Sequence, residues 1–207
     1  KSGFIRHLVI FYFYGYEDLQ NNSLLKRFID SGEPDAVGEL ITFIWQQETY
    51  YNGLQGEERA KFEEIIKKLW EYLLVRYDKS KKKEEKDILN GIIHFVPFVP
   101  ELDENYGKLL LNSAKALNKR VVTHHLVEDF VSLIAKGNSS EVAKIFAPIL
   151  LEIPFNEYIS DFEAEPIKIL VRFLYENEQK KPANTFCHKI SSLGNDFLKS
   201  LYDEFNQ

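Results

Sequence analysis

Four polar residues, His124, His125, Glu128 and Asp129, have the types and spacing in this sequence that come nearest to a catalytic or metal-binding site. Each acid follows one of the histidines by four residues, so it would lie one helical turn away and could orient the imidazole for acid–base chemistry. The two histidines are adjacent and would point about 100° apart on a helix, so they would not chelate one metal ion together. The same residues also suit a polar face near a helix start, which is the interpretation we favour.

Cys187 and His188 are adjacent, a combination that suggests a nucleophile and its base. Neighbouring positions on a helix do not face each other, and Cys187 falls on the apolar stripe of its predicted helix, so we expect a buried structural thiol. His7 and His94 have no metal-ligand spacing, and the sequence contains no phosphate-binding glycine loop, GxSxG or HExxH pattern. We therefore predict a non-enzymatic chain with no catalytic, cofactor-binding or metal-binding residues.

The charge of the chain also limits its partners. The net charge of −6 argues against a general phosphate-binding surface. The run KSKKKEEK from Lys79 to Lys86 could still contact nucleic acid or an acidic lipid, but it includes Glu84 and Glu85, and we favour a solvated helix end. We expect no nucleic-acid partner and no membrane partner, since no apolar run reaches the ~18 residues needed to span a bilayer.

The longest element predicted from the sequence is a helix over residues 57–77. Its apolar residues recur at spacings of three and four, the pattern of one helix face. Glu63 and Glu64 each precede a lysine by four residues and should form ion pairs on the opposite face. Trp70 lies in the apolar stripe, and we expect it to be buried against at least two other helices.

The same apolar spacing predicts further helices in the segments 4–13, 24–29, 37–45, 88–95, 103–117, 126–134, 142–150, 160–174, 182–190 and 197–205. Several residues are predicted to begin or end these helices: Gly15, Asn22 or Ser23, Gly32, Pro34, Pro97 with Pro100, Asp103, Thr123, Ser139 or Ser140, and Ser160 with Glu163 as a capping box. Pro148 should kink or fray its helix. The best strand candidate, residues 92–99, contains prolines and is a poor one.

About eleven helices with short connections predict an all-α chain in which successive helices are antiparallel neighbours. We favour an irregular HEAT-like α-solenoid over a compact bundle, as a single domain over residues 1–207. The hydrophobic content of 44% is that of an ordinary globular chain. The one cysteine fits a reducing compartment, the cytoplasm. The absence of methionine and the apolar opening lead us to expect a piece of a longer protein.

Three stretches of the chain together carry a resemblance. Residues 7–45 pair a helix ending in Tyr-x-Gly with a short Leu-Leu…Phe helix, residues 62–76 include Leu-Trp-Glu, and residues 182–205 place a glycine before a Phe-Leu…Leu-Tyr helix. In this order they are similar to the C-terminal arms of large bacterial STAND-type NTPases. In that family an effector and a NACHT-like ATPase precede a helical-repeat arm that senses a ligand, and many members act in antiviral defence.

The resemblance implies a C-terminal helical-repeat arm of a larger cytoplasmic bacterial protein. Its role would be protein recognition or ligand sensing, and its partner would be another protein or the remainder of the parent chain. The alternative from a different class is a stand-alone helical hydrolase or metal-dependent enzyme that uses the region of His124 and His125.

Overall fold

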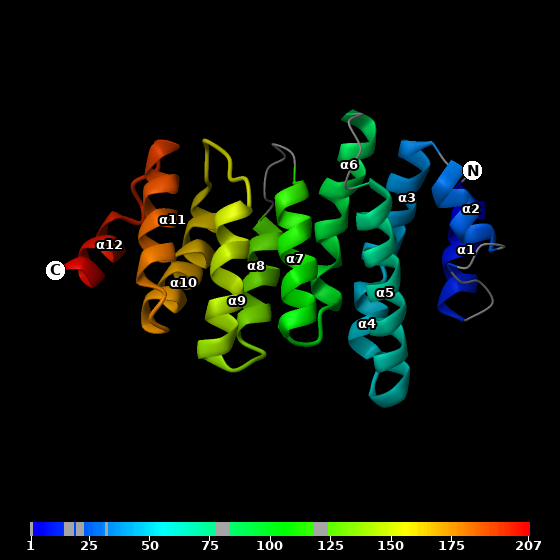
Figure 1. The fold of residues 1–207 in the computed structure, drawn as a ribbon, viewed down its shortest axis with the longest axis horizontal. Coiled ribbons are helices and arrows are strands. Elements are labelled where there is room, and N and C mark those ends of the chain that lie inside the picture. The colour runs from blue at the N-terminus through cyan, green and yellow to red at the C-terminus, as the bar shows by residue number, and fades with distance from the viewer. Residues whose placement is uncertain (1, 15–18, 20–22, 32, 78–82, 118–123) are drawn as a thin grey trace. The chain divides into compact units, whose positions relative to one another are not determined.

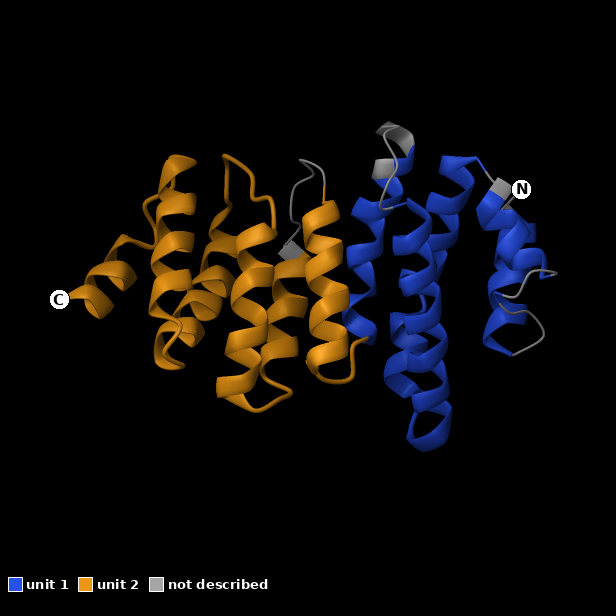
Figure 2. Ribbon diagram, viewed as in Figure 1, with its two compact units in different colours: residues 1–98 blue, residues 99–207 orange. Residues whose placement is uncertain are grey.

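A computed structural model describes the chain except for residues 1, 15–18, 20–22, 32, 78–82 and 118–123, and except for the side chains of residues 2, 31, 83, 84, 86 and 124 (Figure 1). The described residues form α-helices and one 3-10 helix, and no strand occurs among them, which confirms the all-α class. The chain divides into two compact units, residues 1–98 and residues 99–207 (Figure 2). None of the helices in the described ranges combines the length and apolar character required to cross a bilayer.

The first unit contains seven helical elements within its described residues: α1 (Ser2–Phe13), α2 (Leu24–Ser31), α3 (Pro34–Trp45), α4 (Glu48–Gly53), α5 (Gly56–Tyr77), α6 (Lys83–Ile92) and the 3-10 helix η1 (Ile93–Phe98). α3 packs on α1 and on α6, while α6 and η1 pack on α5. One element, α4, was not predicted. Pro97 lies inside η1, and the helical segment ends at Phe98, between the predicted stops Pro97 and Pro100. Proline has no backbone N–H to donate. A short 3-10 helix tolerates this loss because it contains few backbone hydrogen bonds.

The long helix α5 confirms the predicted central element. Its apolar stripe is buried, and Trp70 is only 1% exposed, with its ring edge-on to Phe95 of η1 at a centroid distance of 5.8 Å. On the solvent face, Lys68 Nζ lies 2.5 Å from a carboxylate oxygen of Glu64, as the i,i+4 spacing predicts. The helix begins at Gly56, whose φ of +54° is costly for residues with a side chain.

Asp30, near the end of α2, is held by side chains from α2 and α5. Lys26 Nζ donates a hydrogen bond to its carboxylate at 2.5 Å, the Tyr72 hydroxyl donates another, and Arg76 Nε lies 3.6 Å away. Burial raises the pKa of Asp30, but the hydrogen bonds from Lys26 and Tyr72 outweigh that effect and leave the pKa below its ordinary value. This carboxylate therefore joins α2 to α5 in its ionised form.

The second unit contains α7 (Glu104–Ala116), α8 (His124–Ile134), α9 (Ser139–Glu152), α10 (Asp161–Glu176), α11 (Lys180–Ser192) and α12 (Lys199–Asn206). α9 packs on both α7 and α11, while α10 packs on both α8 and α12, so the helices alternate between two rows (Figure 1). α7 and α9 approach closely at Gly107, where an added Cβ would lie 2.3 Å from the side chain of Ile145. α9 continues through Pro148 to Glu152.

Helix starts agree with the sequence at most described positions. Asp103 accepts a hydrogen bond from the backbone N–H of Tyr106 at 2.7 Å, and the capping box between Ser160 and Glu163 is present. The cap of α9 was predicted wrongly: Asn138 accepts from two backbone N–H groups, and the predicted Ser139 and Ser140 lie inside the helix. An asparagine competes with serine for this role because its carbonyl oxygen also reaches the first free N–H groups.

Two further predictions on helix ends have different outcomes. Ser23 Oγ accepts from the backbone N–H of Lys26 at 3.0 Å, which confirms it as the residue that caps α2. The predicted stops Gly15 and Gly32 and the predicted caps Asn22 and Thr123 lie outside the described residues.

Candidate functional site

The histidine and acid cluster that the sequence offered is only partly described. The side chain of His124 lies outside the described residues. His125 is exposed, and its Nδ1 is 3.7 Å from Glu128 Oε2, so the observed pair has a spacing of three residues where four was predicted. Within the described ranges, no three His, Cys, Asp or Glu side chains come together in a way that could hold a metal ion.

Cys187 is buried, as the sequence predicted. Its Sγ lies 3.6 Å from the hydroxyl of Tyr175, and burial raises the pKa of the thiol, so Cys187 stays protonated at neutral pH. His188 points elsewhere, with its ring 5.3 Å from that of Tyr202. A protonated thiol of this kind is a poor nucleophile.

Most of the lysine-rich run lies outside the described residues. Residues 78–82 and the side chains of 83, 84 and 86 lie outside the described part of the chain. The two remaining histidines have local structural contacts: His7 Nδ1 is 2.6 Å from the carbonyl oxygen of Gly3, and His94 lies against Trp45.

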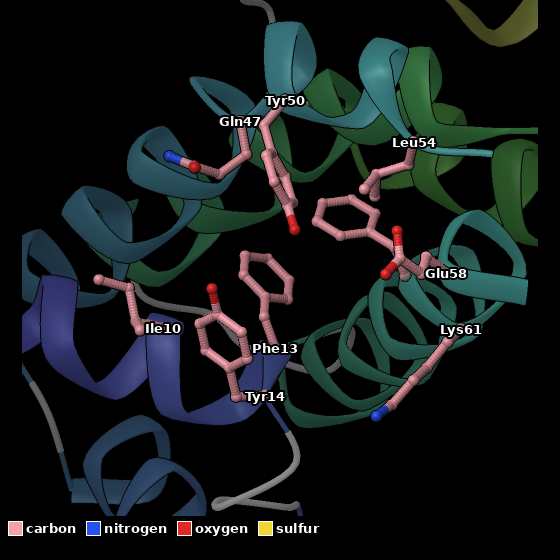
Figure 3. Close-up of a pocket in the computed structure, with 9 residues that line it drawn as sticks. Ile10, Phe13, Tyr14, Gln47, Tyr50, Leu54, Glu58 and Lys61 are labelled. Carbon is pink, nitrogen blue, oxygen red and sulfur yellow. The ribbon is translucent and has the colours of Figure 1, made fainter.

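A pocket that the sequence did not predict lies in the first unit, where α1 ends, α4 passes and α5 begins (Figure 3). Its volume is ≈ 270 Å³. The residues around it are mostly aromatic or apolar, with three polar side chains among them: Ile10, Phe13, Tyr14, Gln47, Tyr50, Leu54, Glu58, Lys61 and Phe62. We call this the aromatic pocket.

Four aromatic side chains from three segments form most of the aromatic pocket. Phe62 of α5 is 4% exposed and stacks on Phe13 of α1, with ring centroids 4.6 Å apart and planes inclined by 28°. Tyr50 of α4 lies 6.1 Å from Phe62 and is 54% exposed, and Tyr14 is 66% exposed. In Figure 3, Tyr50 projects into the space from one side, and Phe13 and Tyr14 project from the opposite side. Large aromatic rings therefore remain open to solvent above a buried aromatic floor.

The outward position of Tyr50 follows from its neighbour. Adjacent residues on a helix point about 100° apart, so only one of Tyr50 and Tyr51 can face the core. Tyr51 is the buried one: its hydroxyl donates to Glu63 Oε1 at 2.8 Å and accepts from Arg59 Nη2 at 2.9 Å. Arg59 Nε also donates to Glu63 at 3.1 Å. This network fastens α4 to α5 and holds Tyr50 at the pocket.

The same network changes the chemistry of its members. Burial, followed by the hydrogen bond to Glu63, raises the pKa of Tyr51 to about 12, so the phenol remains neutral. Glu63, which the sequence placed on the solvent face, is instead half-buried and accepts the hydrogen bond from Tyr51. The buried tyrosine hydroxyl and the arginine are therefore used for structure, and neither lines the pocket.

Two charged residues at the aromatic pocket are not used in this way. Across the described residues, neither Glu58 nor Lys61 forms an ion pair. In Figure 3 the carboxylate of Glu58 lies on the inner side of the pocket, and the ammonium group of Lys61 lies at its lower edge. The lining thus combines aromatic rings with a carboxylate on the inner side and an ammonium group at the edge.

Two other pockets are described in the second unit. One, of ≈ 490 Å³, lies beside α8 and α10, and the other, of ≈ 340 Å³, lies beside α11 and α12. Three of the four charged residues that line the first of these form ion pairs: Arg172 makes two hydrogen bonds with Glu204, and Lys168 Nζ is 2.5 Å from Glu165. The aromatic pocket offers more open aromatic surface and is the better candidate for recognition.

Fold and site together define an all-helical protein with a solvent-accessible aromatic pocket. No protein-family model matches this chain, and it has no match among curated proteins or solved structures. A functional assignment therefore depends on the geometry described above.

Proposed function

We propose that this chain is a non-enzymatic helical-repeat module that recognises a protein or senses a ligand through its aromatic pocket. The observation that carries the proposal is the exposure of Tyr14 and Tyr50 over the buried Phe62. Tyrosine supplies a large contact area with few rotatable bonds, and tyrosines are enriched among the residues that dominate binding energies.

The rigidity of the site supports the same proposal. Recognition costs less free energy when the contacting side chains are already held in place. Tyr50 is fixed through α4 by the hydrogen bonds of Tyr51 with Glu63 and Arg59, and Phe13 is fixed by stacking on Phe62. The pocket would therefore need little rearrangement to bind.

The finer part of the proposal concerns the architecture and the parent protein. We infer a HEAT-like solenoid, supported by the alternation of helices between two rows in the second unit. The resemblance of residues 7–45, 62–76 and 182–205 to STAND-type NTPase arms supports a sensor arm of a cytoplasmic bacterial defence protein. The partner would then be a protein or the rest of the parent chain, with no role for nucleic acid or membrane.

Site-specific photo-crosslinking tests recognition through the pocket. Tyr50 would be replaced by p-benzoylphenylalanine in cells that make the protein, and the intact mass would be measured after irradiation. The control is the same replacement at Tyr158, which is 79% exposed in the second unit and lines none of the pockets described above. A discrete adduct from position 50 and none from position 158 is the expected result. Equal adducts from both positions, or none from either, would refute the proposal.

The parent gene tests the sensor-arm interpretation separately. We expect the reading frame upstream of Lys1 to encode a nucleotide-binding domain with a phosphate-binding glycine loop. A frame that starts with methionine just before Lys1 and encodes no such domain would remove the sensor arm, while recognition by the pocket could still stand.

A further inference from the structure

We propose that the aromatic pocket binds a methylated ammonium group. This inference rests on the proposed function of the pocket and names the chemistry of its ligand. A cation of this kind is attracted to the electron-rich faces of aromatic rings, and its methyl groups are apolar enough to replace water there. The pocket combines four aromatic side chains with a carboxylate.

The arrangement of charge selects a cation over a neutral group. The Glu58 carboxylate lies on the inner side of the pocket and is engaged in no ion pair in the described part of the chain, so it can pair with a bound cation. Lys61 also lines the pocket, and in Figure 3 its ammonium group lies at the lower edge, farther from Tyr50 than the Glu58 carboxylate. Glu63 and Arg59 do not line the pocket and pair with each other at 3.1 Å.

The polarity of the walls selects a methylated ammonium over an unmodified one. An unmodified ammonium group carries three N–H donors, which lose hydrogen bonds to water wherever they meet an apolar wall. Four of the side chains that line the pocket carry no hydrogen-bond acceptor: Ile10, Phe13, Leu54 and Phe62. A methylated group has fewer donors or none, and its apolar surface suits Phe13 and Phe62.

The size of the pocket fits a head group with a short stem. At ≈ 270 Å³ it is smaller than the ~300–1,000 Å³ of sites that enclose drug-sized molecules. A choline-like molecule would fit, and so would the end of a trimethylated lysine side chain presented by a protein. These two sources share the same group and are distinguished by the experiment.

The test is an NMR titration of the ¹⁵N-labelled chain with choline and with 3,3-dimethylbutan-1-ol, its uncharged isostere. Choline should shift the amide signals of residues around Tyr50 and Glu58 and bind more tightly than the alcohol. Tyr50→Ala and Glu58→Gln should each weaken choline binding by about two- to five-fold, the effect of one cation–aromatic or exposed charge contact. Glu57→Gln is the matched control, because Glu57 belongs to the same first turn of α5 but does not line the pocket.

A peptide with trimethyllysine, compared with its unmodified form, is the second arm. Tighter binding of the trimethylated peptide than of choline would identify a protein side chain as the source, and the reverse order would identify a free small ligand. Equal binding of choline and the alcohol, or no pocket-specific shift with choline and with the trimethylated peptide, would overturn the inference. If the inference is overturned but position 50 still gives a photo-crosslinked adduct, the pocket recognises a partner that carries no methylated ammonium group.

Discussion

Trp70→Ala should destabilise the first unit by roughly 3–5 kcal/mol, the range for truncating large aromatic residues in packed cores. Trp70 is 1% exposed and makes an edge-on contact with Phe95, which is itself fully buried. An aromatic side chain of this kind removes about 200 Å² from water, which at about 25 cal/mol per Å² corresponds to about 5 kcal/mol. That value is an upper bound, because alanine keeps part of the area and the unfolded chain already buries some of it.

Equilibrium urea titration followed by tryptophan fluorescence measures this effect in the first unit alone. The two tryptophans of the chain, Trp45 and Trp70, both lie in that unit, so Trp45 remains as the probe in Trp70→Ala. The free energy of unfolding of a small protein falls by about 1–3 kcal/mol per molar of urea, so the urea midpoint should fall by more than about 1 M.

Glu64→Ala on the solvent face of α5 is the matched control for this titration. Among the residues that the structure describes, its carboxylate pairs with the exposed Lys68 alone, so the midpoint should hardly move. Equal shifts of the midpoint in Trp70→Ala and Glu64→Ala would refute the assignment of the two faces of α5.

Three further predictions concern individual positions. Asn138→Ala should destabilise the second unit by about 1 kcal/mol in urea titrations, whereas Ser140→Ala should have a much smaller effect, because Asn138 accepts from the free N–H groups of α9. Gly107→Ala should destabilise by about 1–3 kcal/mol through its clash with α9, whereas Gly38→Ala, in an open helical position, should stabilise by about 0.4–1 kcal/mol; equal effects would contradict the described packing. Asp30 has a lowered pKa in the folded state. The stability that it contributes is therefore present above the ordinary carboxyl pKa of about 3.9 and is lost as pH falls through the pKa of the folded state. Asp30→Asn should lower the urea midpoint at pH 7, and the difference from the unmodified chain should shrink toward pH 3.

Apolar spacing was sufficient to predict the long helices. α5 carries a regular apolar stripe from Phe62 to Tyr77, so the prediction there depended on no single position. α4 was missed because its six residues are too few to show a helical period and end in Asn52-Gly53, which resembles a loop. The cap of α9 was misassigned because three consecutive polar residues, 138–140, could each cap a helix.

The aromatic pocket could not be predicted because its parts are distant in the sequence. Phe13, Tyr50 and Phe62 come from three helices, and each also fits the pattern of a core residue. One local signal was available: adjacent Tyr50 and Tyr51 cannot both face the core of one helix, so one of them had to be exposed. The histidines and Cys187 drew attention in the sequence because of their chemistry, but among the described residues they do not assemble into a site.

Filling the aromatic pocket tests the central claim, recognition through this site, most directly. Leu54 lines the pocket, and Leu54→Trp would occupy much of its ≈ 270 Å³ with little change in the buried core. In the protein that carries p-benzoylphenylalanine at position 50, this substitution should abolish the photo-crosslinked adduct while the urea midpoint stays unchanged. An adduct of the same mass and yield after Leu54→Trp would show that the partner binds elsewhere and would contradict the account.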